Sequence, residues 1–219
     1  MNDTALRGPL QEVAAFQTGV ARHWIERADE VRGKHAFEFV AYFAALNALY
    51  WLWGLLDELE ASTPEERNAV ERALKDGNVP APLASRVLNG LRGMKGESRL
   101  LANLVSNMPE ASATTFVREH AGFMRHLTER GPIREMGRRS RSDAVLDDKT
   151  GRQLHRKLTA ENSSNVRVQA VAGILYLIRC NLVHGSKISD ALDGELLSLS
   201  VQPLRTLAEW AYNLTEARL

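Results

Sequence analysis

Hydrophobic residues recur every three or four positions along most of the chain, with polar residues between them. That spacing places the hydrophobic side chains on one face of an α-helix. Strands instead show short alternating runs rich in Val, Ile and Thr, and the sequence contains no such run. The pattern therefore predicts an all-α protein. The predicted helices span residues 9–31, 35–60, 64–75, 82–91, 98–107, 111–129, 165–184 and 203–217.

Glycines and charged stretches separate these helices. Gly33 and Lys34 mark the break between the first two. Residues 76–110 contain a turn cluster and several glycines, and are predicted to form short peripheral helices. Residues 130–152 carry many charges and few hydrophobic side chains, which predicts a basic, partly mobile loop. No internal repeat is present, and residues 1–219 are predicted to form one domain.

Residues 39–56 are almost entirely apolar, with Asn47 as the single strongly polar side chain. A run of this length reaches the lower limit for a transmembrane helix. We favour a buried core helix, because the run is short, carries an amide near its centre and is followed by Asp57 and Glu58 where cationic residues would flank a membrane span. No membrane association is therefore expected.

Charge and cysteine content narrow the class of protein further. The chain has 28 Lys and Arg against 27 Asp and Glu, a net charge of +1, so that any nucleic-acid site must be local. Cys180 is the only cysteine, which excludes an internal disulfide and a cysteine-based zinc site. The N-terminal segment carries charges where a signal peptide is apolar. These features predict a cytoplasmic protein.

Basic residues are concentrated between positions 118 and 157, where eleven Lys and Arg stand against six Asp and Glu. Such a segment can follow the phosphates of a single-stranded nucleic acid. A solvated charged loop is the commoner origin of a charge run, and it stays open as the alternative. The arginines predicted to bind RNA are Arg138, Arg139, Arg141 and Arg156.

The helix predicted at 165–184 is apolar on nearly every side, and a helix of that kind is covered on both sides. The second cover is either another helix of the same chain or the same helix of a second copy, which would form a two-fold dimer. One apolar face carries Val171, Leu175, Ile178 and Leu182, and the other carries Ile174, Leu177 and Cys180.

Polar residues interrupt the end of this apolar helix at Arg179, Asn181 and His184. The guanidinium fork of arginine matches phosphate oxygens, and histidine exchanges protons near neutral pH. Each residue also has an ordinary alternative: a buried acid for Arg179, a backbone carbonyl for Asn181 and the helix dipole for His184. Their combination beside Lys187 favours a catalytic site that cleaves RNA without a metal.

These residues resemble the HEPN domain family. Arg179, four intervening residues and His184 match the arginine-to-histidine motif of that family, and the string LIRCNLVHGSK is similar to the form found in stand-alone bacterial HEPN proteins. The run FVAYFAALNALYWLWG is similar to the helix that packs on the motif helix there, with Asn47 near the active site. The chain departs from the family at Cys180, where Asn, Asp or His is frequent, so that the amide falls at Asn181.

The resemblance implies an up-and-down helical bundle, with extra short helices here, and in many members a metal-independent endoribonuclease of toxin–antitoxin or phage-defence systems. His184 would act as general acid or base, Arg179 would stabilise charge on the phosphate, and Asn181 would orient these groups, with Asn47 and Lys187 in support. The products would carry 2′,3′-cyclic phosphate and 5′-hydroxyl ends. The implied partners are single-stranded RNA, a second copy of the chain through the 165–184 helix, and an antitoxin protein; no cofactor or metal is implied.

Two other functions stay open from the sequence. One is a catalytically inert HEPN module that binds RNA, a nucleotide or a partner protein, and the other is a helical adaptor with no nucleic-acid role. Metalloprotease, NTPase and serine hydrolase functions are disfavoured, because the sequence has no HExxH pair, glycine-rich phosphate loop or Gly-x-Ser-x-Gly turn.

Overall fold

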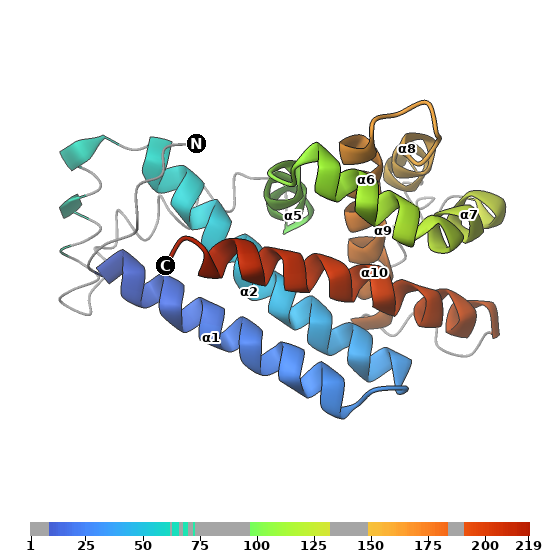
Figure 1. The fold of residues 1–219 in the computed structure, drawn as a ribbon, viewed down its shortest axis with the longest axis horizontal. Helices are drawn as coiled ribbons and strands as arrows, with labels where there is room; N and C mark the ends of the chain where they lie inside the picture. Colours follow the sequence, from blue (N-terminus) through green and yellow to red (C-terminus); the bar gives the residue numbers. More distant parts are fainter. Residues whose placement is uncertain are drawn as a thin grey trace, which may run out of the picture.

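A computed structural model gives the structure of the chain (Figure 1). It describes residues 9–61, 97–131, 149–183 and 191–219, together with 63–65, 68, 69 and 72. All regular secondary structure in these ranges is helical, which confirms the predicted all-α class. The helices are α1 (Pro9–Glu30), α2 (His35–Ala61), α5 (Glu97–Ser106), α6 (Glu110–Glu119), α7 (Ala121–Arg130), α8 (Lys149–Lys157), α9 (Ser164–Val183) and α10 (Ala191–Glu216).

Three long helices, α1, α2 and α10, pack against one another, and the shorter helices α5 to α8 gather with α9 beside them (Figure 1). α1 and α2 run in opposite directions and are joined at Gly33, whose φ of 85° is a left-handed conformation that favours glycine. The Gly33 backbone N–H donates a hydrogen bond of 2.9 Å to the carboxylate of Glu38, in the first turn of α2. The predicted break at Gly33 and Lys34 is confirmed.

α2 supplies the centre of the hydrophobic core. Its side chains Tyr42, Leu46, Leu49 and Trp53 are at most 2% exposed. The Trp53 indole N–H donates a hydrogen bond of 3.0 Å to the hydroxyl of Thr215, which fixes α2 against α10. Within the described residues α2 is the one helix long and apolar enough to span a membrane, and 67% of that stretch is buried inside the protein, as in a core helix.

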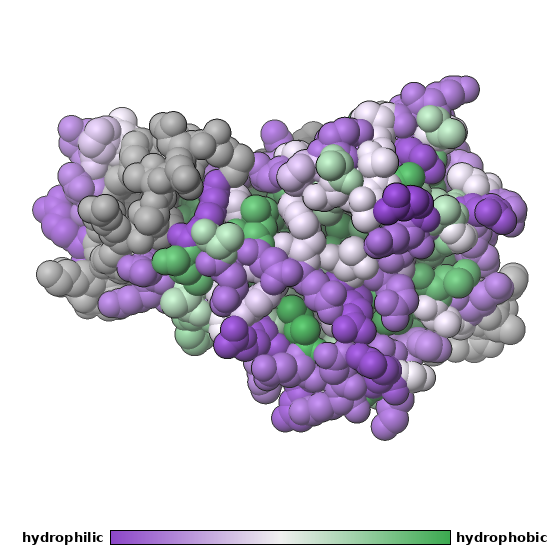
Figure 2. Space-filling model, viewed as in Figure 1, coloured by the Kyte–Doolittle hydropathy of each residue, from purple (hydrophilic) through white to green (hydrophobic). Residues whose placement is uncertain are grey.

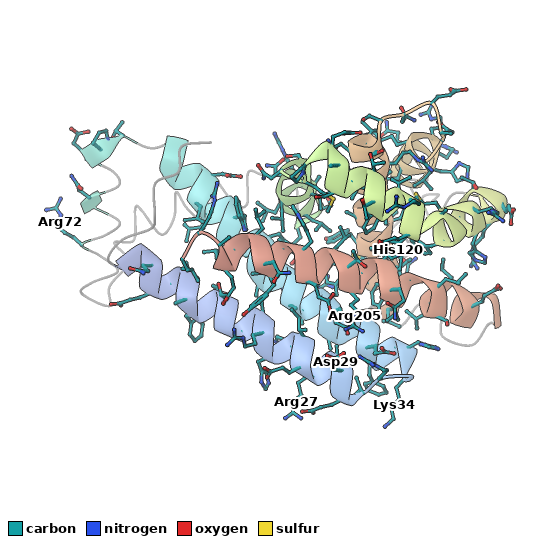
Figure 3. The ribbon with its side chains drawn as sticks, viewed as in Figure 1. Arg27, Asp29, Lys34, Arg72, His120 and Arg205 are labelled. Atoms are coloured by element: carbon teal, nitrogen blue, oxygen red, sulfur yellow. The ribbon has the colours of Figure 1, made fainter. Side chains whose placement is uncertain are left out.

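A polar cluster joins α10 to α1 and α2 at the surface, and Figure 3 shows Arg205 of α10 beside Asp29 of α1. Arg205 donates a hydrogen bond of 2.7 Å to Glu209, lies 3.9 Å from the Asp29 carboxylate and stacks 5.9 Å from the Tyr42 ring centre. The Tyr42 hydroxyl donates to Asp29 at 3.1 Å. A hydrogen bond from Arg32 is the main cause that holds the pKa of Asp29 below its usual value. We call Arg205, Glu209, Asp29 and Tyr42 the Arg205 cluster.

The helix predicted at 111–129 is in fact two helices, α6 and α7, which meet at His120. The His120 ring contacts the hydroxyl of Thr206 on α10 at 3.0 Å and packs on Phe116 with ring centres 4.5 Å apart. Buried side chains continue at helical spacing through this point, at Phe116, Phe123 and Leu127. Hydrophobic spacing could not reveal the break, because contacts with a helix distant in the sequence hold His120 in place.

One helix begins well before its predicted start, and another lies where no helix is predicted. α10 begins at Ala191 instead of 203 and contains Pro203 in its interior. Proline was expected near a helix start because it lacks the N–H that a helix interior uses. Burial of Val201 and Leu204 on either side offsets that loss. α8 begins at Lys149, inside the segment predicted as a loop.

The region predicted as peripheral, residues 76–110, contributes to the core where the structure describes it. Leu100, Leu101, Leu104 and Val105 of α5 are buried, and α5 packs against both α2 and α9. The predicted helix at 82–91 and the loop residues 132–148 lie outside the described residues, as does most of the predicted helix at 64–75.

Candidate functional site

The candidate site lies near the C-terminal end of α9, a helix that the same chain encloses. The hydroxyl of Ser163 accepts a hydrogen bond of 3.4 Å from the Val166 backbone N–H and so caps the helix start. α9 contacts α2, α5, α6, α8 and α10. Leu175 and Leu177, from its two apolar sides, are both at most 2% exposed. Other helices of the same chain therefore provide the second cover.

Arg179 extends from α9 towards α5 and α2. Its Nη1 lies 3.5 Å from Oε2 of Glu97, and its Cζ lies 5.7 Å from the ring centre of Phe43. A charge-assisted bond is usually about 2.7–2.9 Å long, so this ion pair is loose. The side chains of Arg179 and Glu97 are 27% and 29% exposed, which leaves both open to solvent on one side. Burial lowers the pKa of Arg179, but the Glu97 carboxylate and contacts with Cys180 raise it overall.

Gly54 allows α5 to approach α2 closely and so places Glu97. A Cβ on Gly54 would lie 2.5 Å from Cδ2 of Leu100, at the far end of that side chain. Leu100 is one turn after Glu97 in α5, and Gly54 is one turn after Tyr50 in α2. The close helix contact therefore lies one turn from the polar residues on each helix.

Tyr50 is fully buried, and its hydroxyl has no hydrogen-bond partner among the residues that the structure describes. Burial raises the pKa of Tyr50, and the Glu97 carboxylate raises it further, so that the phenol stays protonated at neutral pH. Tyr176 of α9 also has a raised pKa, through burial and then through its interaction with Cys180 one turn later. Cys180 itself is buried and packs inside the protein beside Tyr176.

Asn47 shares a face of α2 with Phe43 and Tyr50, because the three residues are spaced by four and three positions. Its Oδ1 is buried and has no hydrogen-bond partner within the described ranges. Buried polar atoms are usually satisfied, so two unsatisfied atoms on one face of one helix need an explanation. We call Arg179, Glu97, Phe43, Asn47 and Tyr50 the Arg179 cluster.

The structure does not bring all the residues predicted from the sequence to this cluster. Asn181 is helical and partly buried, and two residues along an α-helix it points about 160° away from Arg179. Arg156 is exposed in the last turn of α8. α8 packs on α9 where Leu154 meets Gly173, six residues before Arg179, or about 9 Å along the helix. The remaining predicted site residues lie outside the described ranges: His184, Lys187, Arg138, Arg139 and Arg141.

Sequence reasoning missed Glu97 and Tyr50 as site residues. Glu97 is 82 positions from Arg179, so spacing could not pair them. A buried acid is one partner that the sequence predicts for Arg179, but the sequence does not identify which acid. Tyr50 was hidden in a run that is apolar throughout, and its signal was the face that it shares with Asn47.

An open groove of about 360 Å³ lies elsewhere, between α6 and α10. None of its lining residues belongs to the Arg179 cluster. In the same described part of the chain, no group of three or more His, Cys, Asp or Glu is arranged to hold a metal ion. The lining residues include Met108, Ser112, Thr115, Phe116, Thr206 and Trp210.

Comparisons with protein-family models, curated proteins and solved structures find no match to this chain.

Proposed function

We propose that this protein is a metal-independent HEPN-type endoribonuclease that cleaves single-stranded RNA to 2′,3′-cyclic phosphate and 5′-hydroxyl ends. The observation that carries the proposal is the Arg179 cluster. A partly exposed arginine, loosely paired to Glu97, lies next to the buried and unpartnered hydroxyl of Tyr50. Groups that only stabilise a fold are usually satisfied within it, whereas a binding site keeps polar groups in reserve for its ligand.

The chemistry follows from the residue types. The 2′-hydroxyl attacks the adjacent phosphorus, and the 5′-oxygen of the next nucleotide leaves. Arg179 stabilises the charge that gathers on the non-bridging oxygens. His184, which follows α9 directly in the sequence, takes or gives the proton. Because Asn181 points away from Arg179 along α9, Asn47 is the better candidate for an amide that orients the phosphate or the arginine.

The setting of the enzyme is also proposed from the resemblance. It includes an up-and-down bundle, a cytoplasmic location, a role in a toxin–antitoxin or phage-defence system with an antitoxin partner, and a homodimer through residues 165–184. Burial of the apolar sides of α9 within one chain removes the hydrophobic reason for that dimer, so its support is the resemblance alone. Arg138, Arg139, Arg141 and Arg156, with Lys187, would guide the RNA to the site.

The test is incubation of the purified protein with mixed-sequence single-stranded RNA in EDTA, beside the His184→Ala variant. We expect cleavage by the wild type in the presence of the chelator, with a loss of about 100-fold or more in the variant. A wild type that is inactive in EDTA but active with a divalent cation would contradict the mechanism.

One observation favours the second candidate, an inert module that binds RNA or a partner protein. The carboxylate of Glu97 partly neutralises Arg179 in the absence of substrate. If that pair were permanent, the protein would bind RNA without cleaving it. The same incubation separates the two candidates, because an inert module gives binding in a gel-shift assay and intact RNA.

A further inference from the structure

Beside Arg179, the Glu97 carboxylate can accept a hydrogen bond and the Tyr50 hydroxyl can donate one. The inference that follows rests on the proposed function. We infer that an RNA phosphate displaces Glu97 from Arg179 and that the displaced carboxylate then accepts a hydrogen bond from the Tyr50 hydroxyl. Glu97 and Tyr50 are thus positioning residues that control whether Arg179 is free to bind phosphate.

The ion pair between Arg179 and Glu97 is easily separated. The 3.5 Å separation of Arg179 and Glu97 exceeds that of the Arg205–Glu209 bond in the same protein, which is 2.7 Å. Both side chains of the loose pair are more than a quarter exposed, so water screens their attraction and a phosphate can reach the guanidinium. Arginine binds phosphate through two parallel bonds, which gives the two non-bridging oxygens of a phosphodiester an advantage over a carboxylate held at one atom.

The displaced carboxylate would be costly to leave unpaired in a partly buried place. The Tyr50 hydroxyl offers a donor that no other group in the described part of the chain accepts. Tyr50 is fixed, because it is fully buried on a core helix. Glu97 is the mobile partner, since it lies at the first residue of α5 and is partly exposed. Glu97 shares a face of α5 with Leu100, and Tyr50 shares a face of α2 with Gly54. The close contact between Leu100 and Gly54 therefore brings both residues to the interface of α2 and α5.

The experiment measures the affinity for a fluorescent 2′-O-methyl single-stranded RNA, which cannot be cleaved, by anisotropy at constant salt. Glu97→Gln removes the competing charge and should tighten binding about threefold. Tyr50→Phe removes the hydroxyl donor. It should weaken binding about threefold when Glu97 is present, and it should not weaken binding in the Glu97→Gln background. Glu209→Gln and Tyr42→Phe delete the same chemical groups in the Arg205 cluster and should leave the affinity unchanged.

Arg179→Gln tests the phosphate site separately from the displacement of Glu97. Arg179→Lys is a second variant, which keeps the charge without the guanidinium fork. Equal binding by the wild type and Arg179→Gln would overturn both the phosphate site and the displacement. Weaker binding by Arg179→Gln, together with no gain in Glu97→Gln, would leave the phosphate site standing and overturn the displacement alone. An equal effect of Tyr50→Phe in both backgrounds would also overturn it, because that is what a purely structural tyrosine gives.

Discussion

The Arg205 and Arg179 clusters, two of the arginine clusters among the described residues, have similar components but differ in their hydrogen bonding. Arg205 and Arg179 each face a carboxylate, each stack near an aromatic ring of α2, and each have a tyrosine of α2 close by. In the Arg205 cluster every group is engaged, since the Tyr42 hydroxyl donates to Asp29. In the Arg179 cluster the Tyr50 hydroxyl and the Asn47 amide oxygen have no hydrogen-bond partner among the residues that the structure describes.

In the Arg205 cluster the bond from Arg205 to Glu209 is 2.7 Å long, and Figure 2 shows that this face of the molecule is largely hydrophilic. The two arginine side chains are exposed to a similar extent, 29% for Arg205 and 27% for Arg179, so exposure does not distinguish the clusters. Among the described residues, the Arg179 cluster leaves two buried polar atoms unsatisfied, where the cost is higher than in water. Under the proposed function, this difference assigns Arg205 to the fold and Arg179 to a ligand.

The largest expected effect is on RNA cleavage. Arg179→Gln should lower the cleavage rate about 100-fold or more, because it removes a donor to the charge that develops on the phosphate. Arg205→Gln should leave the rate within about twofold, since its contacts lie within the Arg205 cluster. Initial rates on one RNA substrate check both variants. Equal losses in the two would remove the distinction between the clusters.

A second expected effect is on stability, and here a variant in the Arg205 cluster should have a larger effect than the matching variant in the Arg179 cluster. Tyr42→Phe should reduce the free energy of unfolding by about 1 kcal/mol, because Asp29 loses a donor. Tyr50→Phe should change it by less than about 0.5 kcal/mol, since no hydrogen bond is lost. Urea unfolding followed by circular dichroism measures both. A larger loss in Tyr50→Phe than in Tyr42→Phe would show that the phenol of Tyr50 is already engaged.

Features that depend on local interactions could be predicted from the sequence, and features that depend on contacts between distant segments could not. The all-α class, the break at Gly33 and the placement of Asn47 on a buried helix follow from local spacing and turn chemistry. The pairing of Arg179 with Glu97 does not, because it joins helices 82 positions apart whose approach depends on the close contact at Gly54. Helix geometry gives the direction of Asn181 relative to Arg179, because α9 continues to Val183 and contains both residues.

A third effect concerns the amide. Asn47→Leu should leave stability unchanged or raise it by up to about 1 kcal/mol, because a similar volume replaces an unsatisfied buried oxygen. The same variant should cleave RNA at least about tenfold more slowly if the amide orients the phosphate or Arg179. Thermal unfolding and the cleavage assay are run on the same preparation. Loss of stability with full activity would assign Asn47 to the fold.

The smallest expected effect is the pH dependence of the Arg205 cluster. The pKa of Asp29 lies below its ordinary value of 3.8, mainly through Arg32, so its charged form stabilises the fold. That contribution is present above pH 3.8 and is lost as the pH falls through the lowered pKa. Asp29→Asn should therefore differ from the wild type in unfolding free energy at pH 6 and converge with it near pH 2. A difference that persists at the lower pH would show that Asp29 acts through its shape and not its charge.

The central claim is that Arg179 serves the chemistry of RNA and Arg205 does not, and one assay measures it directly. A single-stranded RNA and its 2′-O-methyl counterpart are incubated in EDTA with the wild type, Arg179→Gln and Arg205→Gln, all purified in the same way. The account predicts 2′,3′-cyclic phosphate ends from the unmodified RNA with the wild type and Arg205→Gln, and intact RNA in every other reaction. Cleavage of the unmodified RNA by Arg179→Gln at the wild-type rate would contradict it.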